Sequence, residues 1–179
     1  MSTLSENNSA HNFLPKNQRD QVESAVLQHI NNINDQYKLT IPPVQIGFDL
    51  KGRNAGIFEL RNSLCRIRFN KIILINNFEQ SLEQTVPHET AHYLTYKIFG
   101  RRNIKPHGPQ WREIMKILGA TADIYHNFDL KNVPIRQQRR FIYSCNCKQH
   151  ELTATRHNRV FREHATYHCR LCGNILKQD

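Results

Sequence analysis

The first regular pattern along the chain is an amphipathic helix between residues 17 and 37. Its apolar residues recur every three to four positions: Val22, Val26, Ile30, Ile33 and Tyr37. Pro42 and Pro43 follow, and because proline cannot continue a helix we expect the helix to end before them. The polar residues 1–15 carry no such pattern, so we expect them to be a disordered lead-in.

Apolar and polar residues then alternate, which is the period of a half-buried strand. The apolar positions of the first run are Val44, Ile46, Phe48 and Leu50. A second short run covers residues 55–60, and a third places Cys65, Ile67 and Phe69 on one face, opposite Arg66 and Arg68. These runs predict a small three-stranded antiparallel sheet that meanders, with Cys65 as a core-facing thiol.

Two helices are predicted in the middle of the chain, over residues 79–99 and 109–118. Pro87 lies inside the first of them and lacks the amide that would bond to the Glu83 carbonyl. We therefore expect a kink, or a new helix start with Pro87 in its first turn. From residue 141 onward, aromatic residues and paired cysteines predict a compact β-rich metal module.

Charge is distributed unevenly along the 179 residues, which carry 25 Lys and Arg against 15 Asp and Glu. Residues 131–179 hold 10 basic and 3 acidic side chains, so the last quarter contributes most of the net charge of +10. Such an excess attracts polyanions through counterion release, and nucleic acid is the usual one inside cells. A basic surface that serves only solubility is the alternative.

No stretch of the sequence approaches the roughly 20 apolar residues of a membrane span, and residues 1–12 lack the apolar centre of a secretion signal. We therefore expect a cytoplasmic protein without a membrane partner. In a reducing compartment, clustered thiols are more often metal ligands than disulfides. Four of the five cysteines lie within the last 35 residues.

The first candidate metal site is the H-E-x-x-H pattern from His88 to His92. Positions i and i+4 project from one helix face, so both imidazoles can reach one Zn²⁺ while Glu89 can act on a water beside it. Such a site needs a third ligand, and the metzincin form fails because Thr95 and Ile98 occupy its Gly and His positions. Two downstream candidates remain, His107 and Glu113.

The second candidate metal site consists of four cysteines near the C-terminus. Cys145-x-Cys147 is followed after 21 residues by Cys169-x-x-Cys172, close to the spacing of a zinc ribbon. The first pair is one residue tighter than the usual C-x-x-C, which leaves His150 or His168 as a replacement for one thiolate. This zinc would be structural, because the site has no open position and no neighbouring base.

The motifs together resemble the SprT/Spartan family of zincin-like proteins, and most closely its bacterial SprT members. The matching segments are VPHETAHYLTYKIFG, PHGPQWREIM, the strands NAGIFEL and IRFN, and the RHNR and cysteine tail, over roughly residues 17–175. The resemblance implies His88, His92 and His107 as ligands of a catalytic zinc, with Glu89 as general base. It also implies that Cys145, Cys147, Cys169 and Cys172 hold the structural zinc. Trp111, one turn after His107, is interpreted as a packing residue.

The predicted organisation is an α+β chain with a zincin-like domain at residues 16–135 and a C-terminal zinc ribbon at 136–179. The predicted function is a zinc metallopeptidase that acts on proteins at DNA, since Spartan relatives cleave DNA–protein crosslinks. The candidate nucleic-acid contacts are five arginines: Arg139, Arg140, Arg156, Arg159 and Arg162. The alternatives are a non-proteolytic nucleic-acid-binding zinc protein and a zinc hydrolase of small amides.

Overall fold

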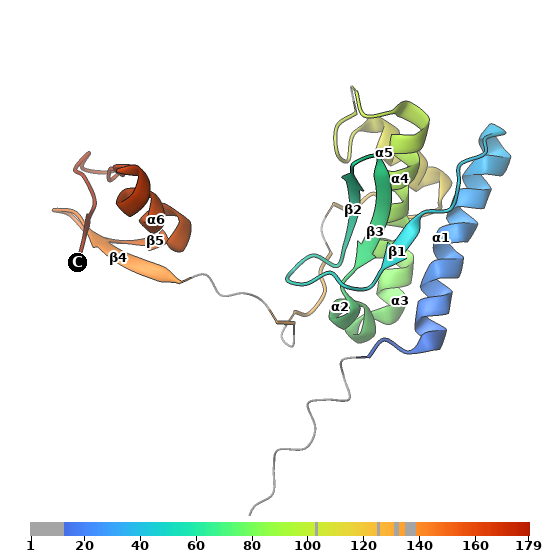
Figure 1. Cartoon of the computed structure of the whole chain (residues 1–179), viewed down its shortest axis with the longest axis horizontal. Coiled ribbons are helices and arrows are strands. Elements are labelled where there is room, and N and C mark those ends of the chain that lie inside the picture. Colours follow the sequence, from blue (N-terminus) through green and yellow to red (C-terminus); the bar gives the residue numbers. More distant parts are fainter. Residues whose placement is uncertain (1–12, 103, 125, 131–132, 135–138) are drawn as a thin grey trace, which may run out of the picture. The chain divides into compact units, whose positions relative to one another are not determined.

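The computed structural model describes residues 13–179 except 103, 125, 131–132 and 135–138. The chain forms two compact units, residues 1–135 and residues 136–179, and each is described by itself (Figure 1). Most of the predicted lead-in, residues 1–12, lies outside the described residues. Leu14, which the prediction included in it, is buried in the core of the first unit, so that part of the prediction is wrong.

The sheet of the first unit comprises β1 (Gln45–Gly47), β2 (Gly56–Arg61) and β3 (Leu64–Phe69), in the order β1-β3-β2. β2 and β3 form the predicted antiparallel hairpin, whose turn residues Asn62 and Ser63 both have positive φ, as the tightest hairpin turns require. β1, however, pairs with β3 in parallel, so the predicted all-antiparallel meander is wrong. The chain crosses from β1 to the far edge before the hairpin returns β3 to the centre of the sheet.

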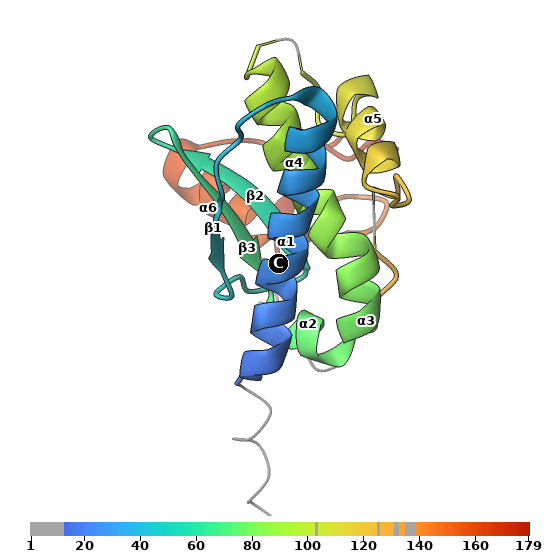
Figure 2. The same cartoon turned by 90° about the vertical axis from the view of Figure 1, so that its right-hand side faces the viewer.

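Helices cover one face of this sheet (Figures 1 and 2). In chain order they are α1 (Lys16–Tyr37), α2 (Lys71–Asn76), α3 (Phe78–Gln80), a π-helical turn η2 (Ser81–Thr85), α4 (Val86–Phe99) and α5 (Pro109–Ile117). The interruption expected at Pro87 is confirmed: the π-helical turn η2 precedes α4, which begins at Val86 with the proline in its first turn, while Thr85 keeps helical dihedral angles. α2 was not predicted, since its continuous apolar run carries no helical period.

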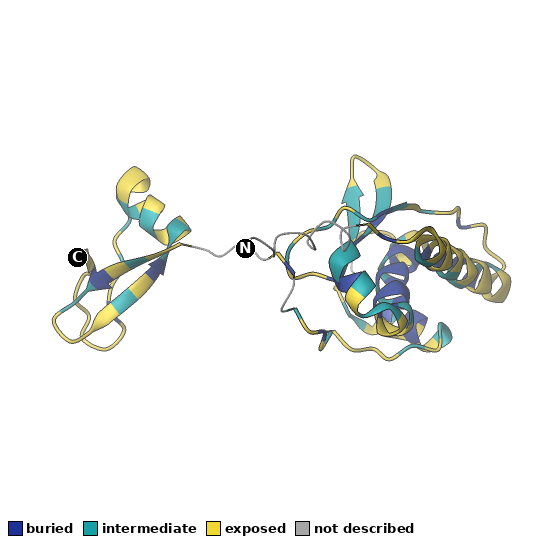
Figure 3. Ribbon diagram, turned by 90° about the horizontal axis from the view of Figure 1, so that it is seen from below, coloured by how far each residue is buried: buried dark blue, intermediate teal, exposed yellow. Residues whose placement is uncertain are grey.

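The core of the first unit lies between the sheet and the helices. Four positions of the apolar stripe of α1, Val22, Val26, Ile30 and Ile33, are buried in one cluster with residues of β3 and α4. The last position, Tyr37, is 36% exposed. Cys65 packs against this core, which is consistent with a structural thiol. Buried positions of the first unit lie in the interior of its helical layer (Figure 3). More than half of the residues of α4, the helix that carries the H-E-x-x-H pattern, are buried, so packing fixes its position.

The second unit comprises β4 (Arg140–Ser144), β5 (Gln149–Thr153), α6 (Ala154–Glu163) and β6 (Lys177–Gln178), with an antiparallel sheet ordered β5-β4-β6. Its buried core is small: Tyr143, Leu152, Cys169 and Leu176. The prediction of a β-rich module missed α6, whose start is capped by the Thr153 side chain. None of the helices among the described residues is long and apolar enough to cross a membrane.

Candidate metal centre and cleft

Three histidines of the first unit converge on one point. His88 and His92 come from successive turns of α4, and His107 comes from the loop before α5. Their Nε2 atoms are 3.2 Å apart between His88 and His92, 3.1 Å between His92 and His107, and 3.0 Å between His107 and His88. Three imidazole nitrogens at such separations fit the donor set of one zinc ion with a fourth position left open.

The third histidine reaches this point because the loop turns sharply around it. His107 has a φ of 57°, and the turn is closed by the Gly108 amide, which donates to the Lys105 carbonyl at 2.9 Å. Arg112 on α5 donates to the His107 carbonyl at 3.2 Å. Glu113, the competing third ligand, instead accepts a hydrogen bond from the Tyr37 hydroxyl at 3.2 Å. Of the two candidates, the structure therefore brings His107 to the other histidines.

Burial keeps the α4 histidines neutral. Desolvation, reinforced by the neighbouring imidazoles, lowers the pKa of His88 to about 4 and of His92 to about 3. His88 Nδ1 lies 3.2 Å from the Asp123 carbonyl oxygen, so a proton on Nδ1 donates a hydrogen bond to this oxygen and Nε2 is free to bind a metal. No side-chain pattern marks this carbonyl, so sequence reasoning could not find it.

Glu89 is buried beside the three histidines, with 7% of its surface exposed. Burial raises the pKa of its carboxyl group to about 7, and a backbone hydrogen bond from Phe58 opposes the rise. A bound dication would lower that pKa. The carboxylate fits against β2 because residue 56 is glycine: an added Cβ would lie 2.6 Å from Glu89 Cγ and 2.9 Å from Thr85 Cγ2.

An open cleft of about 1200 Å³ surrounds this group, lined by the three histidines, Glu89 and β2. β2 is one of the two edge strands of the sheet, so its outer side has no strand partner in the described part of the chain. Three exposed basic side chains also line the cleft: Arg53, Arg101 and Lys105. The cleft therefore combines a candidate metal site, a buried carboxylate and an edge strand that has no second strand partner among the described residues.

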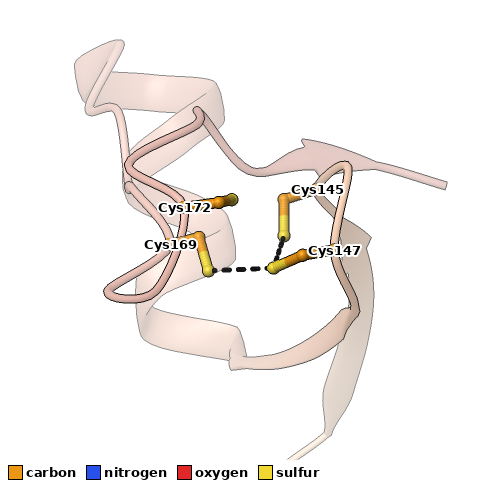
Figure 4. Close-up of side chains that lie close together, drawn as sticks. All are labelled: Cys145, Cys147, Cys169 and Cys172. Atoms are coloured by element: carbon orange, nitrogen blue, oxygen red, sulfur yellow. Dashed lines mark hydrogen bonds between the residues drawn. The ribbon is translucent and has the colours of Figure 1, made fainter.

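The four C-terminal cysteines form a second group in the other unit (Figure 4). They come from the turn between β4 and β5 and from the loop before β6, and the Sγ atoms are 3.3 Å apart for Cys145 and Cys147 and 3.6 Å for Cys147 and Cys169. Backbone amides directed at the sulfurs lower the pKa of the Cys145 and Cys169 thiols, which favours the thiolates that zinc requires. This donor set fits a closed structural site.

The two histidines that could have replaced a thiolate lie outside this group. His150 Nε2 is 3.3 Å from Cys145 Sγ, which is a hydrogen-bonding distance to one of the four sulfurs. His168 Nδ1 lies 3.0 Å from the Gly173 carbonyl oxygen. The sulfurs of all four cysteines lie within 4.8 Å of one another, so they alone complete a tetrahedral donor set.

The five candidate arginines all lie exposed on the second unit, at the start of β4 and along α6. Aromatic rings hold two of them: the guanidinium of Arg139 is 4.9 Å from the Phe141 ring centroid, and that of Arg156 is 5.8 Å from that of Tyr167. Arg159 pairs with Glu163 at 3.6 Å. Exposed guanidinium groups of this kind can bind phosphates.

Comparison with known proteins identifies the family. The model of the SprT-like family matches residues 26–139. This chain belongs to the SprT-like family. It is 36% identical to Protein SprT of Glaesserella parasuis over 87% of this chain and 96% of that protein. It is 37% identical to Protein SprT of Escherichia coli O157:H7, over 87% of this chain and 93% of that protein.

The SprT-like match covers most of the first unit, including the three histidines and Glu89. Sequence reasoning had named these four residues, but it missed what surrounds them. The Phe58 amide and the close approach of Gly56 support Glu89, while the Asp123 carbonyl supports His88. Each supporting group belongs to the backbone, so no sequence motif could predict it.

Proposed function

We propose that this SprT-like protein is a zinc-dependent metallopeptidase that acts on proteins at DNA. The observation that carries the proposal is the convergence of three imidazoles beside a buried carboxylate, in a cleft lined by an edge strand. His88, His92 and His107 would hold the ion. Bound zinc supplies Lewis acidity that polarises a peptide carbonyl and makes a neighbouring water more acidic.

Glu89 is the proton carrier in this proposal. It takes a proton from the attacking water as general base and returns it to the leaving amine nitrogen as general acid. The Phe58 amide donates a hydrogen bond to its carboxylate, and the missing Cβ at Gly56 leaves room for the side chain against β2. The substrate backbone would lie along the outer edge of β2, because an extended peptide can pair with an unpaired strand.

The second unit supplies the proposed contact with DNA. Arg139, Arg140, Arg156, Arg159 and Arg162 would bind backbone phosphates without selecting a sequence. We further propose that the protein works in the cytoplasm, because a reducing compartment keeps its four clustered thiols available for zinc.

The direct test compares zinc-loaded wild type with Glu89→Gln on a protein covalently linked to DNA. The substitution keeps the shape of the side chain but removes the base, so we expect cleavage to fall at least 100-fold while both zinc ions stay bound. Equal cleavage by both proteins would contradict the mechanism. Glu23→Gln, at an exposed position of α1 that does not line the cleft, is the matched control for a Glu→Gln exchange and should leave turnover unchanged.

A second candidate function is a zinc protein that binds nucleic acid without cleaving protein. The exposed arginines of α6 favour it, because they need no chemistry in the cleft. It predicts salt-dependent DNA binding by wild type and Glu89→Gln alike, with no turnover by either. Replacing Arg156, Arg159 and Arg162 by Gln would then remove all function, whereas a peptidase would retain activity on free peptides.

A further inference from the structure

Trp111 contacts every histidine of the metal centre. Its ring centroid is 4.8 Å from that of His88 and 4.7 Å from that of His107, both with edge-to-face geometry. It is 5.5 Å from the ring centroid of His92, with the two planes 29° apart. One indole thus forms a common wall for three side chains that come from two separate segments.

The indole itself is held tightly. Trp111 is 1% exposed, lies in the first turns of α5, and its Nε1–H donates to the His88 carbonyl oxygen at 3.3 Å. This bond joins α5 to the first ligand of α4, while the short connection from residue 107 to 111 joins α5 to the third ligand. A packing role for the core alone, as the sequence suggested, would not require contact with all three rings.

We propose that Trp111 is a positioning residue of the three-histidine centre, which holds the imidazoles in the arrangement that a metal needs before the metal arrives. Free histidine side chains would have to be ordered when the ion binds, and that ordering weakens binding. An indole already packed on all three rings removes part of this cost. Loss of such a supporting group typically lowers metal affinity 10–100-fold. The proposal rests on the zinc site of the proposed function but not on proteolysis.

The first measurement is zinc affinity. Zinc is titrated into the metal-free full chain against a chromophoric chelator, and His107→Ala shows which binding step belongs to the histidines. Trp111→Leu keeps an apolar side chain but no ring, so it should weaken that step 10–100-fold and leave the cysteine step unchanged. Trp111→Phe restores a ring and should bind within a few-fold of wild type.

Ile114→Ala is the matched control for packing. Ile114 lies on the same helix, is fully buried in the core and has no ring to place against the histidines. It should lower the melting temperature yet leave the histidine step within a few-fold of wild type. If Ile114→Ala weakens that step as much as Trp111→Leu does, Trp111 is only a core residue and the proposal is overturned.

The second measurement uses Trp111 as a reporter, since it is the single tryptophan of the chain. Co²⁺ at the histidine centre should quench its emission, His107→Ala should abolish that quenching, and Cys172→Ser should preserve it. Equal zinc affinity of Trp111→Leu and Trp111→Phe would overturn the positioning role while the zinc site stands. A wild-type protein without any zinc step sensitive to His107→Ala would overturn the site itself, and this proposal with it.

Discussion

Gly56→Ala should separate catalysis from folding and from metal binding. Gly56 lies at the start of β2, where the Glu89 side chain passes directly over the strand. A Cβ at this position would lie 2.6 Å from Glu89 Cγ, about 1 Å short of an ordinary carbon–carbon contact. Glu89 must therefore move by about 1 Å, and a displacement of that size at a reacting group can cost about 100-fold in rate.

Stability should change little in the same variant. Alanine is favoured over glycine in a strand by roughly 0.5–1 kcal/mol, which offsets part of the crowding against Glu89 and Thr85. We expect a melting temperature within a few degrees of wild type and two zinc ions per chain. Cleavage of a DNA-linked protein should nevertheless fall about 100-fold.

Gly47→Ala is the matched control, a second strand glycine of the same sheet without positive φ. Its added Cβ would meet the guanidinium of Arg66, the end of a flexible side chain that can swing aside. Cleavage should therefore stay at the wild-type rate. Full activity of Gly56→Ala would show that the placement of Glu89 against β2 has no part in the reaction, and would refute the reasoning.

Three further outcomes are expected. Chelation of zinc should unfold residues 136–179, because their core has only four buried residues. The helical circular dichroism of the first unit should stay intact. Retained near-ultraviolet signals from Tyr143 would contradict this expectation. Burial lowers the pKa of His29, so this side chain binds a proton more tightly in the unfolded chain than in the folded one. The free energy of unfolding should therefore fall as the pH drops below about 6.5. His29→Gln should reduce this pH dependence in denaturant titrations. Asn34→Ala removes two hydrogen bonds to the Ile41 backbone, of 2.7 and 3.0 Å, and should cost about 1–3 kcal/mol in urea unfolding.

Helices α1, α4 and α5 could be predicted because their information is local. The stripe from Val22 to Ile33 matches the buried face of α1, and Pro87 marks the start of α4. The parallel pairing of β1 could not be predicted, because alternation has the same period in parallel and antiparallel strands. α6 was missed because its sequence contains few apolar residues, and none of them is buried.

In the candidate site, too, some residues could be predicted from the sequence and others could not. The spacing of His88 and His92 encodes a shared helix face, and the cysteine spacing encodes a second cluster. The resemblance to the SprT family, rather than spacing, favoured His107 over Glu113, and the structure places Glu113 against Tyr37. What holds the site in place arises from tertiary contacts such as the Asp123 carbonyl, which have no sequence pattern.

The most direct test of the account counts bound zinc by elemental analysis in wild type, His107→Ala and Cys172→Ser. Two separate donor groups predict two zinc ions per wild-type chain and one in each variant, with a different ion lost each time. The remaining ion should show thiolate coordination in His107→Ala and nitrogen coordination in Cys172→Ser. A single zinc in all three proteins would contradict the two-site account and, with it, the proposed hydrolytic centre.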